Sequence, residues 1–148
     1  MSDLAEGVAQ AFVRAINRQD VEALAALMTL EHRFVDSLGN VAEGREKMRA
    51  AWVGYFRMVP DYTIEVEETF CDGLVVVMLG VARGTYCPDS ESHLKSPNAR
   101  DQGHPELQVE NRWETPAALR AVVEDGLVAE WRVYADNEPI RERIRRAG

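Results

Sequence analysis

Up to Pro60 the apolar residues recur mainly at helical spacing. Between Asp3 and Arg18 they form one stripe, which predicts an amphipathic helix. Asp20 then stands where an N-cap would for a shorter helix, VEALAALM, at residues 21–28. A third helix is predicted from about Arg45 to Val59, and Pro60 ends it because proline cannot continue a helix.

One alternating segment, HRFVDSLG at residues 32–39, interrupts the helices and predicts a strand. Its alternation places His32, Phe34 and Asp36 on one face, and a loop, LGNVAEG, is expected to follow. His32 lies about 13 Å from Asp36 at ~3.3 Å per residue, which is too far for a direct dyad. We therefore interpret His32 as a structural or surface histidine.

After Pro60 the pattern changes to long strands. YTIEVEETF predicts a strand with Tyr62, Ile64, Val66 and Phe70 facing inward. Asp72-Gly73 is typical of a tight hairpin, and the returning strand, LVVVMLGVARGTY at residues 74–86, is apolar on both faces. Such a strand is expected at the centre of a sheet or beneath a partner subunit.

A polar segment at residues 87–106 interrupts the strands and is too long for a simple turn. A mobile lid, a dimer-contact loop and plain surface disorder are all open for it. Two final strands are expected, Leu107 to Val123 and Leu127 to Ala135, joined by Asp125-Gly126. For the basic tail PIRERIRRAG a last helical turn is open, and a solvated segment is the favoured interpretation.

Length and charge narrow the functional classes. The 148 residues predict one domain spanning 1–148, and 17 basic against 25 acidic residues give a net charge of −8. That charge argues against nucleic acid and membrane partners, and the N-terminus lacks a signal-peptide pattern, so a cytoplasmic location is expected. Cys71 and Cys87 are expected to be free thiols.

No cofactor or metal is expected. The loop's His93 and His104, with acidic neighbours, do not follow a known ligand spacing. We find no phosphate-binding glycine loop, dinucleotide fingerprint or Ser-His-Asp order.

The last strand raises the question of a cavity. Alternation places Trp131 and Val133 on one face and Tyr134 and Asp136 on the other, and we expect Trp131 to line a cavity. Core and pocket remain open for a set of large aromatics, since these carry much of the burial of any small domain; they are Trp52, Phe56, Tyr62 and Trp131. A pocket wall and a dimer face are both open for Tyr55, Tyr86 and Trp113.

Three segments, FVDSLGNVAEG, MVPDYTIEVEE and DGLVAEWRVYADNEPI, resemble the SnoaL-like branch of the nuclear transport factor 2-like superfamily. The resemblance implies an α+β cone with three N-terminal helices packed on a curved, mainly antiparallel sheet. It also implies a conical pocket for a small, largely apolar molecule and a homodimer formed through the outer sheet face. The expected ligand-binding residues are Phe12, Phe34, Trp52, Phe56, Tyr62, Trp131 and Val133.

Asp36 matches the general-base aspartate of ketosteroid isomerase, a member of the same superfamily, and is the first expected catalytic residue. A solvated or turn-capping role is the alternative, because SLGN, which follows it, is typical of a turn. The isomerase's oxyanion-binding tyrosine and acid are replaced here by Phe12 and Ala118, so its reaction is not expected. Limonene epoxide hydrolase, another similar member, uses two aspartates and an arginine. One aspartate corresponds to Val133 here, and the arginine and the second aspartate fall near Gly80 and Ala82, so epoxide hydrolysis by that triad is not expected.

Arg120 is the second expected catalytic residue. If Ala118 and Val122 face the cavity, Arg120 does so too and needs a partner or an anionic ligand. Pairing with Asp36 would lower the carboxyl pKa and weaken it as a base. A strand register shifted by one residue would instead place Arg120 in solvent.

Two functional hypotheses follow. In the first, the pocket performs cofactor-free acid–base chemistry of the isomerase, cyclase or dehydratase type. In the second, the chain is a non-catalytic ligand-binding or dimerisation module whose cone is filled by its own aromatics.

Overall fold

The computed structural model describes residues 2–87, 111–136 and 138–147, in which helices pack against a mixed six-stranded sheet. The helices are α1 (Ser2–Asn17), α2 (Val21–Ala26), α3 (Arg45–Met58) and α6 (Glu138–Ala147). The described residues thus form four helices where the sequence predicts three. The fourth arises from the basic tail, which was expected to be solvated but packs against the sheet.

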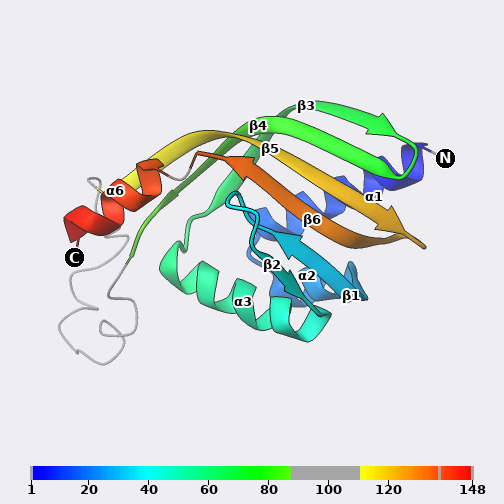
Figure 1. The fold of residues 1–148 in the computed structure, drawn as a ribbon, viewed down its shortest axis with the longest axis horizontal. Helices are drawn as coiled ribbons and strands as arrows, with labels where there is room; N and C mark the ends of the chain where they lie inside the picture. The colour runs from blue at the N-terminus through cyan, green and yellow to red at the C-terminus, as the bar shows by residue number, and fades with distance from the viewer. Residues whose placement is uncertain (1, 88–110, 137, 148) are drawn as a thin grey trace.

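Six strands form the sheet: β1 (Met28–Val35), β2 (Val41–Glu43), β3 (Thr63–Asp72), β4 (Val75–Thr85), β5 (Arg112–Glu124) and β6 (Leu127–Ala135). Their order is β2-β1-β6-β5-β4-β3, and only the β1–β6 pair is parallel. β2 lies in the segment expected to be a loop. β3, β4 and β5 curve over α1, and β1 and β6 end on the side where α6 lies (Figure 1).

A bulge in β3 changes the phase of its alternation. The pairing with β4 shifts between Val66 and Glu68, so Phe70 comes to lie opposite Val77 and is 54% exposed. The prediction that Phe70 faces inward is therefore wrong, because one inserted residue moves the following side chains to the other face. Ile64, before the bulge, is buried as expected.

The same bulge leaves no space for a side chain at Gly80. Gly80 pairs with Val66, and a Cβ atom built at this position would lie 1.9 Å from the carbonyl oxygen of Glu65. This contact involves backbone, which cannot move aside as a flexible side chain can. Glycine is therefore needed where the bulged strand approaches β4.

Gly80→Ala is expected to lower the free energy of unfolding by about 1–3 kcal/mol, the usual cost of overpacking. Gly54→Ala is the matched control, because Gly54 lies within α3 and a Cβ atom there meets nothing within 4 Å. It should raise stability by ~0.5–1 kcal/mol through helix propensity. Urea unfolding of both variants measures the difference, and equal stabilities would contradict the role assigned to Gly80.

His32 joins β1 to β6 where their ladder is interrupted. The two strands pair at Met28–Val128 and again only at Arg33–Glu130. Between these points the fully buried His32 ring has its Nδ1 atom 2.7 Å from the carbonyl oxygen of Val128. Because a carbonyl oxygen can only accept, Nδ1 donates the hydrogen bond, and the side chain takes the place of a missing backbone donor.

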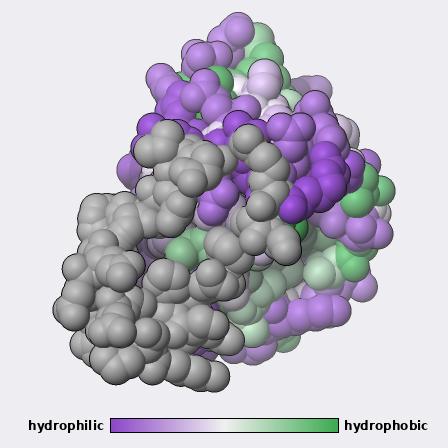
Figure 2. All heavy atoms as spheres, turned by 90° about the vertical axis from the view of Figure 1, so that its left-hand side faces the viewer, coloured by the Kyte–Doolittle hydropathy of each residue, from purple (hydrophilic) through white to green (hydrophobic). Residues whose placement is uncertain are grey.

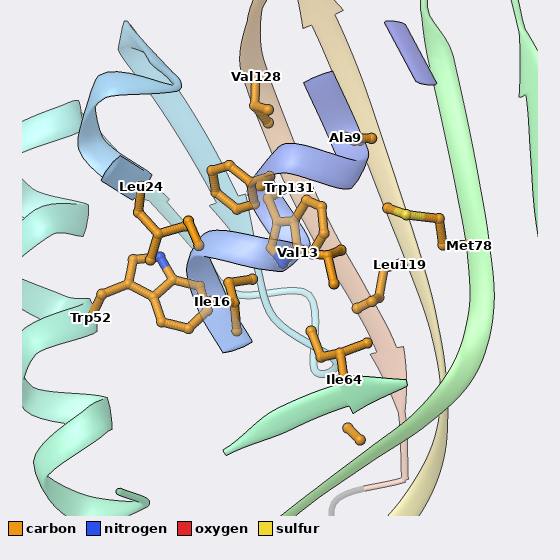
Figure 3. Packing of buried hydrophobic residues seen from close by; sticks show 14 of the residues in the cluster. Ala9, Val13, Ile16, Leu24, Trp52, Ile64, Met78, Leu119, Val128 and Trp131 are labelled. Carbon is orange, nitrogen blue, oxygen red and sulfur yellow. The ribbon is translucent and has the colours of Figure 1, made fainter. Parts of the chain in front are cut away.

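The core lies between α1 and the concave face of the sheet. Phe12 packs on Trp131 with a ring-centroid distance of 4.6 Å, and its ring lies 5.9 Å from that of His32. Figure 3 shows Trp131 and Leu119 of the sheet meeting Val13 of α1. This cluster closes the end of the molecule away from α6.

Burial should make His32 a source of pH-dependent stability. Desolvation lowers the pKa of its imidazole below the ordinary value of ~6.5, although the Val128 hydrogen bond and the Glu130 charge act in the opposite direction. The unfolded chain therefore binds a proton more readily than the folded chain. The stabilising contribution is complete above pH ~6.5 and is lost as the pH falls through the folded-state value.

Wild type and His32→Gln should consequently differ in their pH profiles of unfolding free energy between about pH 7.5 and 5. The wild type loses stability faster on acidification, while the variant is less stable at neutral pH but has a flatter profile. Urea unfolding at several pH values measures both curves. Parallel curves would show that His32 is not the titrating group.

Candidate functional site

A cavity of about 250 Å³ lies between α3 and the sheet, at the ends of β1 and β6. Its wall is mostly aromatic and small apolar side chains, with polar groups from the segments that follow β1 and β6. Figure 2 shows this end of the molecule, where apolar residues lie below a broad hydrophilic band. The lining residues are Phe34, Asp36, Ser37, Met48, Ala51, Trp52, Tyr55, Tyr62, Ala82, Trp113, Thr115, Ala117, Val133, Ala135 and Asp136.

Five aromatic rings form a continuous wall. Trp52 meets Phe34 and Tyr55 with interplanar angles of 78° and 89° and centroid distances of 6.3 and 6.0 Å. Tyr55 meets Tyr62 at 86° and 5.0 Å, and Tyr62 lies 6.0 Å from Trp113. The wall forms because Trp52 and Tyr55 share one face of α3, while Phe34 on β1, Trp113 on β5 and Tyr62 just before β3 lie towards it.

The structure divides the predicted ligand-binding residues into two groups. Phe34, Trp52, Tyr62 and Val133 line the cavity. Phe12, Phe56 and Trp131 lie instead in the hydrophobic core and are not among the cavity's lining residues. Trp131, which we expected to line a cavity, is 1% exposed and packs on Phe12, because α1 fills the space beneath that part of β6.

Asp36 lines the cavity and also closes the turn between β1 and β2. Its Oδ1 atom accepts hydrogen bonds of 2.9 Å from the backbone N–H groups of Leu38 and Asn40, and its Oδ2 atom accepts one of 3.1 Å from Asn40 Nδ2. Desolvation raises the pKa of the carboxyl, but bonds from Asn40, Leu38 and Gly39 outweigh it and hold the pKa below its ordinary value. Asp36 is therefore an anion at neutral pH and a weak base.

Arg120 lies on the opposite face of the sheet from the cavity, contrary to expectation. The buried positions of β5 are the odd-numbered ones, from Trp113 to Val123, so Arg120 faces outward with Ala118. There its guanidinium contacts Glu130 at 2.8 Å. The actual register is the alternative in which the alternation is shifted by one residue.

Residues that the sequence did not assign to a pocket complete the site. Tyr55 and Trp113 were left open between pocket and dimer face, and both line the cavity. Asp136 was expected on the opposite face from Trp131, as sheet exterior, interface or hydrogen-bonding support. It lines the cavity because β6 ends at Ala135 and strand alternation does not extend past that point. Its Oδ1 atom accepts a hydrogen bond from Glu138 N at the start of α6, and its carbonyl oxygen accepts one from Thr115.

The wall also offers hydrogen-bond donors. Burial raises the pKa of Tyr55 and Tyr62 far above their ordinary value, so both phenols stay protonated. The buried indole nitrogens of Trp52 and Trp113 have no hydrogen-bond partner within the described part of the chain. An indole N–H can only donate, so each of these groups would be satisfied by an acceptor from a ligand or water.

Comparison with known families agrees with this architecture. The model of the SnoaL-like domain matches residues 9–131. The chain belongs to the SnoaL-like family. A comparison with curated protein sequences gave no match.

Solved structures of similar fold cover nearly the whole chain. A candidate SnoaL-like polyketide cyclase from Shewanella denitrificans is 14% identical, with a TM-score of 0.74 and coverage of 96% of this chain and 97% of that one. IdmH, a candidate polyketide cyclase from Streptomyces antibioticus, is 20% identical, with a TM-score of 0.68 and coverage of 95% and 97%. A protein with a ketosteroid isomerase-like fold from Catenulispora acidiphila, in complex with trimethylamine, is 15% identical, with a TM-score of 0.69 and coverage of 92% and 90%. At these identities the likeness establishes the nuclear transport factor 2-like fold alone.

The expectations about metal binding and membrane partners can be compared only with the described part of the chain. Within the described ranges, no three His, Cys, Asp or Glu side chains are grouped so as to hold a metal ion. The segment containing His93 and His104 lies outside those ranges. No helix of the described chain is long and apolar enough to cross a membrane.

Proposed function

We propose that the SnoaL-like cavity binds a small, largely apolar molecule, and that Asp36 contacts the polar group of this molecule during cofactor-free acid–base chemistry. The observation that carries the proposal is the position of the Asp36 carboxylate in the wall of an otherwise aromatic cavity. A preformed apolar pocket with a few polar groups is the usual form of a small-molecule site. The Catenulispora protein of similar fold is in complex with trimethylamine, which supports a small molecule as the ligand class.

The reaction class is proposed as isomerisation, cyclisation or dehydration. The residues do not support the specific sites of two relatives: Ala118 faces outward, and Val133 and Ala82 are apolar groups in the cavity wall. Because Asp36 has a lowered pKa, proton abstraction would be helped by a substrate that displaces Asn40 Nδ2 and takes away one of its hydrogen bonds. Binding and orientation of a substrate need no such change.

A non-catalytic module is the second candidate. It is supported by Phe12, Phe56 and Trp131, which belong to the buried core of the chain and do not line the cavity. In this case the cavity would bind a ligand or remain a packing feature, and Asp36 would act only as the turn residue of the β1–β2 hairpin.

A thermal-shift panel of polycyclic ketones, quinones, terpenoids, small amines and fatty acids tests the pocket. A ligand at one hundred times its dissociation constant stabilises the native state by ~2.7 kcal/mol, which is readily detected. Ala51→Phe should abolish the shift because Ala51 lines the cavity, while Ala50→Phe, an exposed neighbour on the same helix that does not line it, should retain the shift. Hits then serve as substrates, and Asp36→Asn should abolish turnover while leaving binding measurable.

The outcomes of the thermal-shift and turnover experiments distinguish a catalytic pocket from a non-catalytic module. Hits that survive Ala51→Phe would place the ligand elsewhere and contradict the proposed pocket. Hits without turnover in the wild type would favour the binding module. A panel without any hit would overturn the small-molecule proposal.

We further propose that two copies of the chain associate through the outer face of the sheet. This face carries apolar side chains on adjacent strands, including Phe70, Val77 and Leu79 on β3 and β4, and Phe70 is more than half exposed. Near them an ion-pair group joins Arg33 and Arg120 to Glu130. An apolar sheet face with compensated charges is suited to a self-complementary interface.

Phe70→Lys is expected to convert a dimer into a monomer. The variant chain should still fold, because Glu68 and Asp72 flank this position on the same strand face and can pair with the new ammonium group. Leu4→Lys is the control, since Leu4 is similarly exposed, at 64%, but lies on α1. Sedimentation velocity measures both, and a wild-type monomer at high concentration would overturn the interface.

A further inference from the structure

We propose that the ligand of this cavity is an organic cation: a small ammonium or quaternary ammonium compound whose carbon substituents fill the apolar volume. The inference rests on the proposed small-molecule pocket and specifies its ligand class. It is carried by the combination of aromatic rings and uncompensated carboxylates in one cavity.

The aromatic wall is suited to a positive charge. Cations are attracted to the faces of Trp, Tyr and Phe rings within about 6 Å, and most strongly where water is excluded. Along this wall three ring pairs, Phe34–Trp52, Trp52–Tyr55 and Tyr55–Tyr62, meet at 78° to 89°, whereas Tyr62 meets Trp113 at 39°. Rings that meet edge to face cover less of each other than stacked rings do, which leaves ring surface for a ligand.

The charges lining the cavity have a single sign. Asp36 and Asp136 are its ionisable carboxylates, and none of its described lining residues is Lys, Arg or His. The described hydrogen bonds to these two carboxylates come from neutral groups: those to Asp36 from Leu38, Gly39 and Asn40, and that to Asp136 from the backbone of Glu138. No described salt bridge compensates either charge, although Arg33, Arg83 and Arg120 all have acidic partners elsewhere.

A cation would complete this arrangement, whereas other ligand classes would not. Both carboxylates are accessible to solvent, so a positive group near Asp36 and Asp136 gains a screened Coulomb energy from the pair. An anionic ligand would be repelled by both carboxylates and by the chain's net charge of −8. A neutral ligand would fill the volume but leave both charges without a counter-charge.

The indole donors narrow the ligand class further. Trp113 is 5% exposed, and its Nε1 atom has no partner within the described ranges. A hydroxyl or carbonyl oxygen on the ligand can accept a hydrogen bond from this group. A short amino alcohol or its quaternary derivative carries both the required charge and an acceptor.

Two probe ligands of nearly equal shape show how much the positive charge of the ligand contributes to affinity. Choline and 3,3-dimethylbutan-1-ol differ only in that a positively charged nitrogen replaces a quaternary carbon. Isothermal titration at pH 7 and low salt is expected to show choline binding at least tenfold more tightly. Tetramethylammonium, which lacks the hydroxyl oxygen, should bind more weakly than choline but more tightly than the neutral alcohol.

Variants assign the effect to the two carboxylates. Asp36→Asn keeps an acceptor oxygen for the turn and should weaken choline binding at least fivefold without changing the affinity for the neutral alcohol. Asp136→Asn should act in the same direction. Asp72→Asn removes a carboxylate from the far end of β3 and serves as the control that should leave both affinities unchanged.

The outcomes distinguish this inference from the proposed function. Equal affinity for the two isosteres, lost in Ala51→Phe, would overturn the cation inference and leave the small-molecule pocket standing. Preferential choline binding that is unchanged in both aspartate variants would also overturn it. Failure of choline and every panel compound to bind would overturn both proposals.

Discussion

The position of the site depends on how β1 joins the sheet beside β6. These strands run parallel, so their carboxyl ends lie at the same edge, and the residues that follow them, Asp36 and Asp136, line one cavity. Their backbone ladder is interrupted between Met28 and Arg33, and the His32 side chain supplies a hydrogen bond to Val128 across that gap. Because an unpaired carbonyl buried at this point would cost free energy, the imidazole is part of the sheet's bonding.

The cone is divided into a filled end and an open end by the length of α1 and the placement of α3. Phe12 packs against Trp131 at the filled end, where the sheet curves over α1. Towards α6 the sheet faces α3 instead, and small residues such as Ala82 and Ala117 leave space in front of Trp52. Small side chains on the strands opposite large rings on the helix thus account for a cavity within a close-packed domain.

Alternation and helical spacing predicted much of the fold and part of the site. They placed Phe34 and Asp36 on one face, and both residues line the cavity, although β1 ends at Val35 and Asp36 lies just beyond it. They failed at Phe70, since a bulge is not visible in the hydrophobic pattern. For Arg120 they failed for a different reason: Ala118 and Val122 make the outer face of β5 as apolar as many inner faces, so the pattern does not reveal the register.

The pattern of apolar and polar residues also did not predict two contacts that depend on the path of the backbone after β6. The basic tail forms α6 and packs against β5, where Arg143 Nε donates to the carbonyl oxygen of Arg112. Asp136 enters the cavity because the chain turns after β6 and the carboxylate caps the first turn of α6. Ile140 and Ile144 are spaced for one helical face, but two isoleucines in a tail composed largely of charged residues are too short a stripe to predict this docking.

In the described part of the chain, charged side chains are paired on the outer face of the sheet but not in the cavity on its inner side, and this difference bears on function. On the outer face Glu130 is held between Arg33 and Arg120, so that each charge has a partner within the fold. On the inner side Asp36 and Asp136 line an aromatic cavity with hydrogen bonds from neutral groups and without a described cationic partner. Hydrogen bonds to the turn and to α6 explain why these carboxylates are tolerated structurally. They do not supply a counter-charge, and beside an aromatic wall this unbalanced negative charge favours a ligand that brings a positive one.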